Sequence, residues 1–227
     1  CIFPLMVFFQ KDLGTAIILL SIFTVMFFAS PILRKEKLKT FGLGIVVIGI
    51  VAGIIFAKTG SVLSKTQLER FDFFDPCSKY ESGGYQICNG FIAINSGGLV
   101  GVGVGESKQI SYIPESHTDS VFAIIAEEYG FIGSTVIMGL YILILWRIIS
   151  LSSRANTLKG KYICLGVATY IFLHIFINLG GLFGIMPLTG VPLPFLSYGG
   201  SFTLSLIIAL SLVQRVHIET KNQKIRI

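Results

Sequence analysis

The chain has 227 residues, of which 53% are hydrophobic and only 13% are charged. Soluble domains carry about 25% charged residues, so this composition argues against a soluble domain and for a membrane protein. The net charge of +6 does not indicate nucleic-acid binding, because the basic residues are divided among short segments and form no single patch.

Five apolar runs approach or reach the length that an α-helix needs to cross a bilayer, about 17–25 residues. The backbone finds no water in hydrocarbon, so each run is expected to be helical. The opening residues 2–9 look like the end of a further helix that is cut off. We therefore predict an all-α polytopic membrane protein with about five transmembrane helices, at residues 13–30, 41–57, 129–149, 162–186 and 195–213.

Basic residues mark one side of the membrane. Residues 31–40, residues 147–161 and the tail from residue 214 hold 12 of the 18 Lys and Arg residues and two acids. These segments fall on one side if the spans alternate, and the positive-inside rule makes that side the cytoplasm. The C-terminus is then cytoplasmic, and the one large loop, residues 58–128, is extracytoplasmic.

Loops as long as residues 58–128 are usually functional or disordered. Cys77 and Cys88 could pair if this loop faces an oxidising compartment, and two unpaired thiols agree equally well with the sequence. Residues 85–96 are expected to form a short helix that lies on the membrane or dips into it.

A glycine-rich run at residues 97–105 weakly resembles a phosphate-binding loop. It lacks the strand before it and the helix after it that give such loops their function. Close backbone packing or a flexible turn is the simpler interpretation. The alternative is that its N–H groups approach a pyrophosphate.

Four acids and a histidine stand within 14 residues before the third span: Glu115, His117, Asp119, Glu127 and Glu128. Carboxylates at the mouth of a membrane helix are costly unless they face water, a partner charge or a substrate. If the chain is helical from Glu115 onward, Glu115 and Asp119 lie on one face. Acids also suit the dipole of a helix's first turn, so a structural role for Glu127 and Glu128 is equally open. A lone histidine such as His117 is more often a surface or capping residue than a catalyst.

Two more features are predicted on the same face. Asp12 stands near the N-terminus of the first span. Residues 187–201 join the fourth and fifth spans and contain three prolines and three glycines. Irregular backbone at membrane depth is stable only when it is buried in protein or lines a wet cavity. We expect a built site or a re-entrant segment there, with a merely rigid turn as the alternative.

Several motifs resemble those of the SEDS family, the FtsW, RodA and SpoVE proteins of bacterial cell-wall synthesis. Residues 190–201 (GVPLPFLSYGGS) resemble the family's signature near its last helix, and residues 10–15 (QKDLGT) resemble its Gln-Pro-Asp-Leu-Gly-Thr motif. Residues 114–119 (PESHTD) resemble its Pro-Glu-x-His-Thr-Asp motif, which residues 127–130 (EEYG) continue. The resemblance covers nearly the whole chain, and residues 103–109 are closer to FtsW and sporulation-type members than to RodA.

The chain departs from the family pattern at a few positions. Lys11 stands where the family usually has Pro, and Phe202 stands where a second Ser is common. Ser120 and Val121 stand where Phe-Ile is usual. Lys11 and Ser120 flank candidate site residues.

The resemblance implies a ten-helix fold with both ends in the cytoplasm, of which the five spans would be helices six to ten. The chain would then be the C-terminal half of such a protein, and this half need not be active by itself. The expected location is the bacterial cell membrane, with the active face extracytoplasmic.

The implied function is a peptidoglycan glycosyltransferase that polymerises lipid II into glycan strands during cell division or cell-wall growth. The reaction needs a base for the acceptor hydroxyl and stabilisation of the departing pyrophosphate. Asp119 is the candidate catalytic base, both by the family motif and because it stands beside Glu115 and His117. The candidate substrate-binding residues are Gln10, Asp12, Gln109, Glu115, His117, Thr118, Ser197, Tyr198, Gly199, Gly200 and Ser201.

A divalent cation, Mg²⁺ or Mn²⁺, that bridges the pyrophosphate to carboxylates is the expected cofactor, although the sequence holds no dedicated metal motif. No organic cofactor is expected. The implied partners are lipid II, a class B penicillin-binding protein, and divisome or elongation proteins, with no nucleic acid among them.

Two other functions are compatible with the sequence. A transporter that flips the lipid-linked precursor would also use irregular backbone between spans. Against it, most polar residues cluster on one face, and the first, third and fifth spans hold no charge at their centres. A non-catalytic scaffold for the penicillin-binding protein would not need Asp119.

Overall fold

The fold is taken from a computed structural model. It describes residue 7 and residues 12–59, 76–78 and 84–225, and within these ranges the regular structure is entirely helical. Gln10 and most of the first part of the predicted outer loop lie outside the described residues. The described helices are α2 (Leu13–Ala29), α3 (Arg34–Thr59), α5 (Tyr85–Gly97), the short 3-10 helix η2 (Gln109–Ser111), α6 (Val121–Arg154), α7 (Leu158–Leu182) and α8 (Gly200–Ile225).

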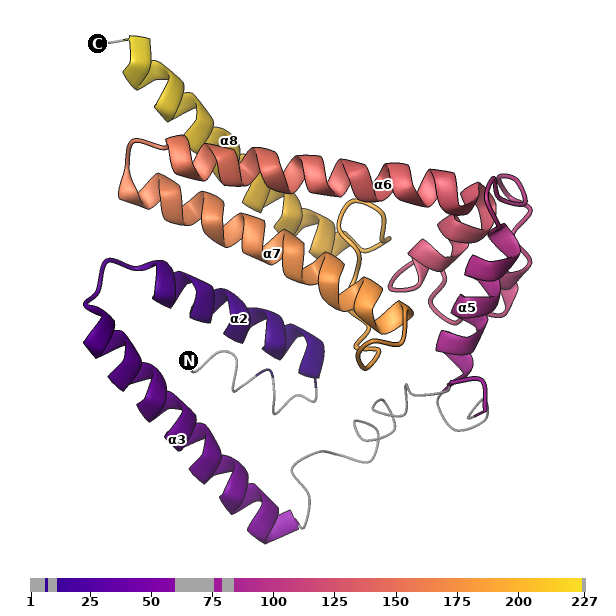
Figure 1. Ribbon diagram of the computed structural model, residues 1–227, viewed down its shortest axis with the longest axis horizontal. Coiled ribbons are helices and arrows are strands. Elements are labelled where there is room, and N and C mark those ends of the chain that lie inside the picture. The colour runs from indigo at the N-terminus through magenta and orange to yellow at the C-terminus, as the bar shows by residue number, and fades with distance from the viewer. Residues whose placement is uncertain (1–6, 8–11, 60–75, 79–83, 226–227) are drawn as a thin grey trace.

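The helices pack around α7. Figure 1 shows α6 and α7 side by side and antiparallel, with α2 along the other side of α7 and α8 crossing behind. α5 stands across the end of α6 where α6 begins, and α3 diverges from α2. The fold therefore has a bundle of spanning helices and a smaller cap, built from α5 and its neighbouring loops, at one end.

All five predicted spans are largely helical, as expected. Among the described residues, three helices are long and apolar enough to cross a membrane by length and composition, namely α6, α7 and α8 up to Asn222. The predicted fourth span ends too late, because α7 closes at Leu182 in a turn where Gly184 has φ +64°. The predicted fifth span starts too early, because Pro192, Pro194 and the left-handed φ of Phe195 (+68°) keep that stretch irregular.

The third span was predicted at residues 129–149. Its predicted start falls at a kink in α6, and the helix itself begins eight residues earlier. α6 begins at Val121 and is kinked at Gly130, where φ is +65° and ψ is −165°. The residues before the kink were assigned to the loop because of their acids, but Phe122 and Ala123 are buried and anchor this first part of α6 in the core. The kink breaks the helical hydrogen-bond ladder, and the freed backbone groups need other partners.

The glycine loop, residues 97–105, supplies those partners. The Val102 and Gly103 N–H groups donate to the carbonyl oxygens of Glu127 (3.0 Å) and Glu128 (3.2 Å). In return the Phe131 N–H donates to the Gly98 carbonyl (2.9 Å). A side chain at Gly101 would lie 2.1 Å from the Glu128 carbonyl oxygen. The close-packing interpretation of this run is confirmed, and these N–H groups bond to protein acceptors.

The segment between α7 and α8, residues 183–199, is called the proline segment below. Its Leu193 is fully buried in the main core, and Val191 packs with Ile18 of α2 and Ile177 of α7 in a second core cluster. The Tyr141 hydroxyl of α6 donates to the Pro194 carbonyl, and His174 Nδ1 of α7 lies 3.1 Å from the Pro192 carbonyl. Side chains of neighbouring helices thus satisfy this irregular backbone, as membrane depth requires.

The docking of the glycine loop predicts different costs for two substitutions that look alike in the sequence. Gly98 has φ +53° with open space around it, and Gly101 has φ +91° with a backbone carbonyl in the way. Gly98→Ala should cost only the backbone strain of its conformation (φ +53°, ψ −139°), which residues other than glycine rarely adopt, about 1–3 kcal/mol. Gly101→Ala should lower the melting temperature in detergent further and speed trypsin cleavage after Lys108. Equal effects of the two substitutions would contradict this docking.

Candidate active site

Asp119 lies in a series of turns that precedes α6, called the acidic turn below (residues 113–120). The shared helix face of Glu115 and Asp119 depended on a helix from Glu115 onward, and this condition is not met, because the helix begins only at Val121. Glu115 has φ +56°, and its carbonyl accepts from the N–H groups of Thr118 (3.0 Å) and Ser120 (3.3 Å). The Thr118 hydroxyl also donates to the Glu115 carboxylate (2.8 Å). Local hydrogen bonds of this kind compete with helix formation.

The acidic turn is attached to α7 through a buried amide. Asn178 Nδ2 donates to the backbone carbonyl of Asp119 (2.6 Å) and to that of Val191 in the proline segment (2.8 Å). Asn178 is only 4% exposed. One side chain therefore joins the acidic turn, the proline segment and α7.

Two more contacts join the acidic turn to the proline segment. The Ser197 hydroxyl accepts from the Leu193 N–H (2.6 Å) and donates to the Thr118 carbonyl. The Tyr198 N–H donates to the His117 carbonyl (2.9 Å). The two stretches with the strongest family motifs, 79 residues apart at Thr118 and Ser197, thus form a single unit.

The Asp119 side chain is buried within this unit. Its Oδ1 lies 3.4 Å from Gln86 Nε2, and a side chain at Gly190 would come within 3.6 Å of its Oδ2. Burial raises the pKa of the Asp119 carboxyl, its own backbone N–H opposes this, and the charge of Glu115 raises the pKa further. A carboxylate with a raised pKa is a better base near neutral pH than an ordinary one.

The C-terminal half of the signature borders an open hollow. Ser197, Tyr198, Gly199 and Gly200 line a hollow of about 580 Å³ together with Leu204 and other residues of early α8. Tyr198 is 81% exposed, whereas Ser201 does not line the hollow and its carbonyl accepts from Ser205. Of the predicted residues here, Ser197 positions the backbone and Tyr198 is available to a ligand.

The N-terminal candidate Asp12 lies at the start of α2. Its carboxylate caps the helix by accepting from the Thr15 N–H (3.0 Å). Gly14 is pressed against Thr189 and Val191, since a side chain there would lie 2.6 Å from Val191 Cγ2. This contact brings the start of α2 to the proline segment and leaves the exposed Asp12 with a capping role. Gln10, predicted beside it, lies outside the described residues.

Gln109 and Glu127 belong to another cluster. Glu127 is 1% exposed, and its carboxylate accepts from the hydroxyls of Ser96 (3.1 Å) and Ser107 and from the N–H groups of Lys108 (3.2 Å) and Gln109 (3.1 Å). Glu128 accepts from the Gly105 N–H (3.0 Å). Both acids hold the glycine loop on α6, and Gln109 does not meet Asp119 in the part of the chain that the structure describes.

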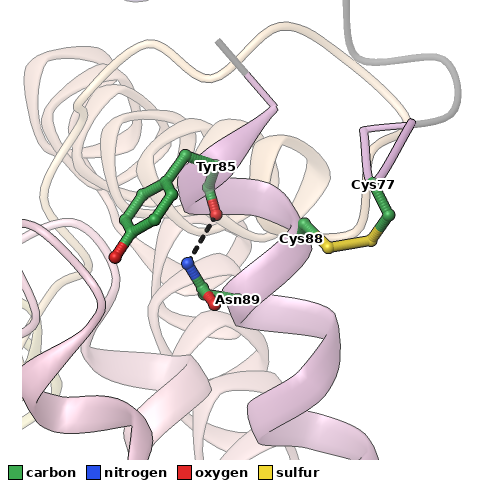
Figure 2. Close-up of a disulfide and its surroundings, with 4 residues drawn as sticks. All are labelled: Cys77, Tyr85, Cys88 and Asn89. Carbon is green, nitrogen blue, oxygen red and sulfur yellow. Dashed lines mark hydrogen bonds between the residues drawn. A yellow bond between two sulfur atoms is a disulfide. The ribbon is translucent and has the colours of Figure 1, made fainter. Parts of the chain in front are cut away.

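Two contacts of the site were missed by sequence reasoning. Gln86 bonds to Ser120 Oγ (2.8 Å) as well as approaching Asp119, and Asn178 carries the two bonds described above. An amide in the middle of an apolar span is a signal that could have found Asn178. Gln86 is on α5, whose start is held by a disulfide between Cys77 and Cys88 (Figure 2). Of the two alternatives for these cysteines, the structure has the pair.

The expected divalent cation would need several converging ligands. Among the described residues no three His, Cys, Asp or Glu side chains converge so as to hold a metal ion. Asp119 and Glu115 are two carboxylates on one turn, which falls short of a protein-built cation site. The cation therefore stays a prediction, and no step below depends on it.

The chain is similar to known proteins over nearly its whole length. A family model described as "cell cycle protein", FtsW/RodA/SpoVE, matches residues 1–222. The probable peptidoglycan glycosyltransferase FtsW of Coxiella burnetii is 37% identical over 218 residues, which cover 94% of this chain and 56% of the relative. FtsW of Bacillus subtilis is 36% identical (93% and 53% covered), and the peptidoglycan glycosyltransferase MrdB of Escherichia coli K12 is 36% identical (96% and 58% covered).

Two solved structures share the fold. The first is a chain from a peptidoglycan synthase complex, in a study of the structural coordination of polymerization and crosslinking. It superposes with a TM-score of 0.68 and 27% identity, and the match covers 94% of this chain and 58% of that one. An aspartate-to-alanine mutant of the rod shape determining protein RodA from Thermus thermophilus has a TM-score of 0.59 and 25% identity, with 96% and 54% covered.

The chain spans about half the length of the curated relatives that it matches. The family match nevertheless extends over nearly all of it, and the matched range includes the acidic turn and the proline segment. The chain belongs to the FtsW/RodA/SpoVE family of polytopic membrane proteins, the SEDS family.

Proposed function

We propose that the protein polymerises peptidoglycan strands as a glycosyltransferase acting on lipid II, with Asp119 as its general base. The relatives named above support the reaction class. The observation that carries the residue assignment is the buried Asp119 carboxylate, which lies between Gln86 and Gly190 in the unit formed by the acidic turn and the proline segment.

In the proposed step the acceptor sugar hydroxyl gives its proton to the Asp119 carboxylate. The acceptor oxygen forms a bond to the anomeric carbon of the donor sugar, and the bond from that carbon to the pyrophosphate breaks. The lipid pyrophosphate leaves with the electron pair. Gln86 orients Oδ1, and the absence of a side chain at Gly190 keeps the neighbourhood of Oδ2 open. Positioning of this kind supplies the base in the geometry that proton transfer needs.

We place the acidic turn on the extracytoplasmic side and Arg154 on the cytoplasmic side. The distribution of Lys and Arg supports this orientation, and α6 carries the two at opposite ends. The disulfide of Cys77 and Cys88, next to α5, also fits an oxidising compartment. A class B penicillin-binding protein is the proposed partner, since the structural neighbour belongs to a synthase complex that couples polymerization to crosslinking.

Removal of the proposed base should abolish polymerisation. Asp119→Ala in the protein of natural length should reduce glycan synthesis from detergent-solubilised lipid II by roughly 100- to 10,000-fold, the usual contribution of general-base catalysis. Membrane insertion and the melting temperature should stay close to normal. Glu106→Gln, which removes an exposed acid, is the matched control and should keep full activity.

This experiment also separates the alternatives. A transporter or a scaffold has no need of a base, so an Asp119→Ala protein that is folded and still polymerises lipid II would rule out the assignment. Lipid II in detergent requires no flipping, so polymerisation by the unaltered protein is itself incompatible with a function limited to transport.

The charge of Glu115 should appear in the pH profile. Only the deprotonated Asp119 accepts a proton, so the rate should rise with pH through the raised pKa of Asp119. Glu115→Gln removes a negative charge that raises this pKa, so the acidic limb of the rate profile should move to lower pH. Glu106→Gln should leave the limb in place. A limb that stays unchanged in Glu115→Gln would show that Asp119 does not set it.

A further inference from the structure

A second cavity lies far from the acidic turn, between the C-terminal part of α6 and α8. Its volume is about 180 Å³, and its lining includes Arg147 and Arg154 of α6 and His217 and Lys221 of α8. At 1.5 Å per residue, α6 from its kink to Arg154 spans about 35 Å, so this cavity lies near the opposite membrane surface.

The spacing of the lining residues shows that two helix faces build the cavity. Arg147, Ser150 and Arg154 recur at intervals of three and four on α6, and His217 and Lys221 are four apart on α8. Such residues project from one face of a helix. α6 and α8 each present a polar face to the same space.

The charged side chains that line this cavity are all basic. Its lining contains no Asp or Glu. The ion pairs found among the described residues join Lys39 to Glu36 and Arg215 to Glu219, so no described carboxylate neutralises Arg147 or Lys221. Three permanent cations around one small cavity repel one another, and an anion between them would relieve this repulsion.

Two simpler effects, the positive-inside bias and the helix dipole, explain only part of why three cations surround this cavity. The positive-inside bias explains cations near this membrane surface, but it does not gather them around a cavity. Arg154 is in the last turn of α6, where the helix dipole favours a cation. Arg147 is two turns further back and Lys221 is on another helix, so the dipole of α6 does not explain their convergence.

The apolar surroundings indicate what kind of anion fits. Trp146, beside Arg147, is 63% exposed, and Leu143, one turn earlier, is 59% exposed. Exposed apolar side chains on the same helix, within one turn of Arg147, suit the acyl chains of a lipid whose headgroup lies in the cavity, and tryptophan is enriched at the membrane interface. Basic pockets between transmembrane helices bind anionic lipid headgroups.

We propose that this cavity binds a phosphate-bearing anion, the phosphodiester headgroup of an anionic phospholipid, through Arg147, Arg154 and Lys221. The Ser150 hydroxyl lines the same cavity and can donate a further hydrogen bond, whereas the Thr220 hydroxyl donates to the Val216 carbonyl (2.8 Å). A free phosphate shares this chemistry, and the test below distinguishes the two sources.

The test measures binding of dioleoyl phosphatidylglycerol to the detergent-purified protein of natural length by native mass spectrometry. Arg147→Gln combined with Arg154→Gln should weaken this binding roughly 30-fold, at the usual contribution of each cation near a lipid surface. Arg34→Gln combined with Lys35→Gln removes the same charge from two exposed residues at the start of α3 and is the matched control. Dioleoyl phosphatidylcholine and inorganic phosphate are run in parallel.

Selective binding of phosphatidylglycerol that the pocket variant loses and the control keeps supports the lipid site. Binding of inorganic phosphate in place of the lipid, with the same dependence on Arg147 and Arg154, assigns the cavity to soluble phosphates and overturns the lipid assignment. Equal binding by the pocket variant and its control overturns the proposal. Lys221→Gln, at an exposed position near the end of α8, gives the same comparison if the double variant fails to fold.

Discussion

The two hydrogen bonds that the Asn178 amide donates are the contacts on which the site depends. This amide holds the backbone carbonyls of Asp119 and Val191 at once, in an environment with almost no access to water. Without it two carbonyls would be left unsatisfied, at about 1–3 kcal/mol each. The acidic turn is not held at Asp119 by helical hydrogen bonds. The bond from Asn178 therefore makes the position of Asp119 depend on α7.

The two buried acids of this region have different roles because their surroundings differ. The Glu127 carboxylate accepts four hydrogen bonds, and these bonds hold the glycine loop to α6. Asp119 also has hydrogen-bond partners, namely its own backbone N–H, the Gln86 amide and the Ser120 side chain, but burial outweighs them and the charge of Glu115 adds to its effect, so the pKa of Asp119 rises. A satisfied carboxylate stabilises a fold, whereas an under-satisfied one is available for proton transfer.

The sequence predicted the helices because span length is a local property. The orientation of their ends, inferred from the distribution of charge, stays a prediction. The sequence also pointed to Asp119 through a motif of six residues. It did not predict the start of α6, because the acids of residues 113–128 suggest a loop while buried Phe122 and Ala123 extend the helix. Gln86 and Asn178 meet Asp119 across 33 and 59 residues. The spacing of residues along the sequence carries no information about a contact between an amide and a distant turn. The structure was therefore needed to find the contacts of Gln86 and Asn178.

Hydrogen exchange in an Asn178→Ala protein tests the central claim most directly, which is that one amide fixes both irregular segments. Asn95→Ala, on the exposed side of α5, is the control. We predict that peptides covering residues 113–120 and 187–199 exchange faster together in Asn178→Ala, while those of α6 beyond the kink stay protected. Unchanged exchange in both segments, or a loss of protection in only one, would contradict this account of the site.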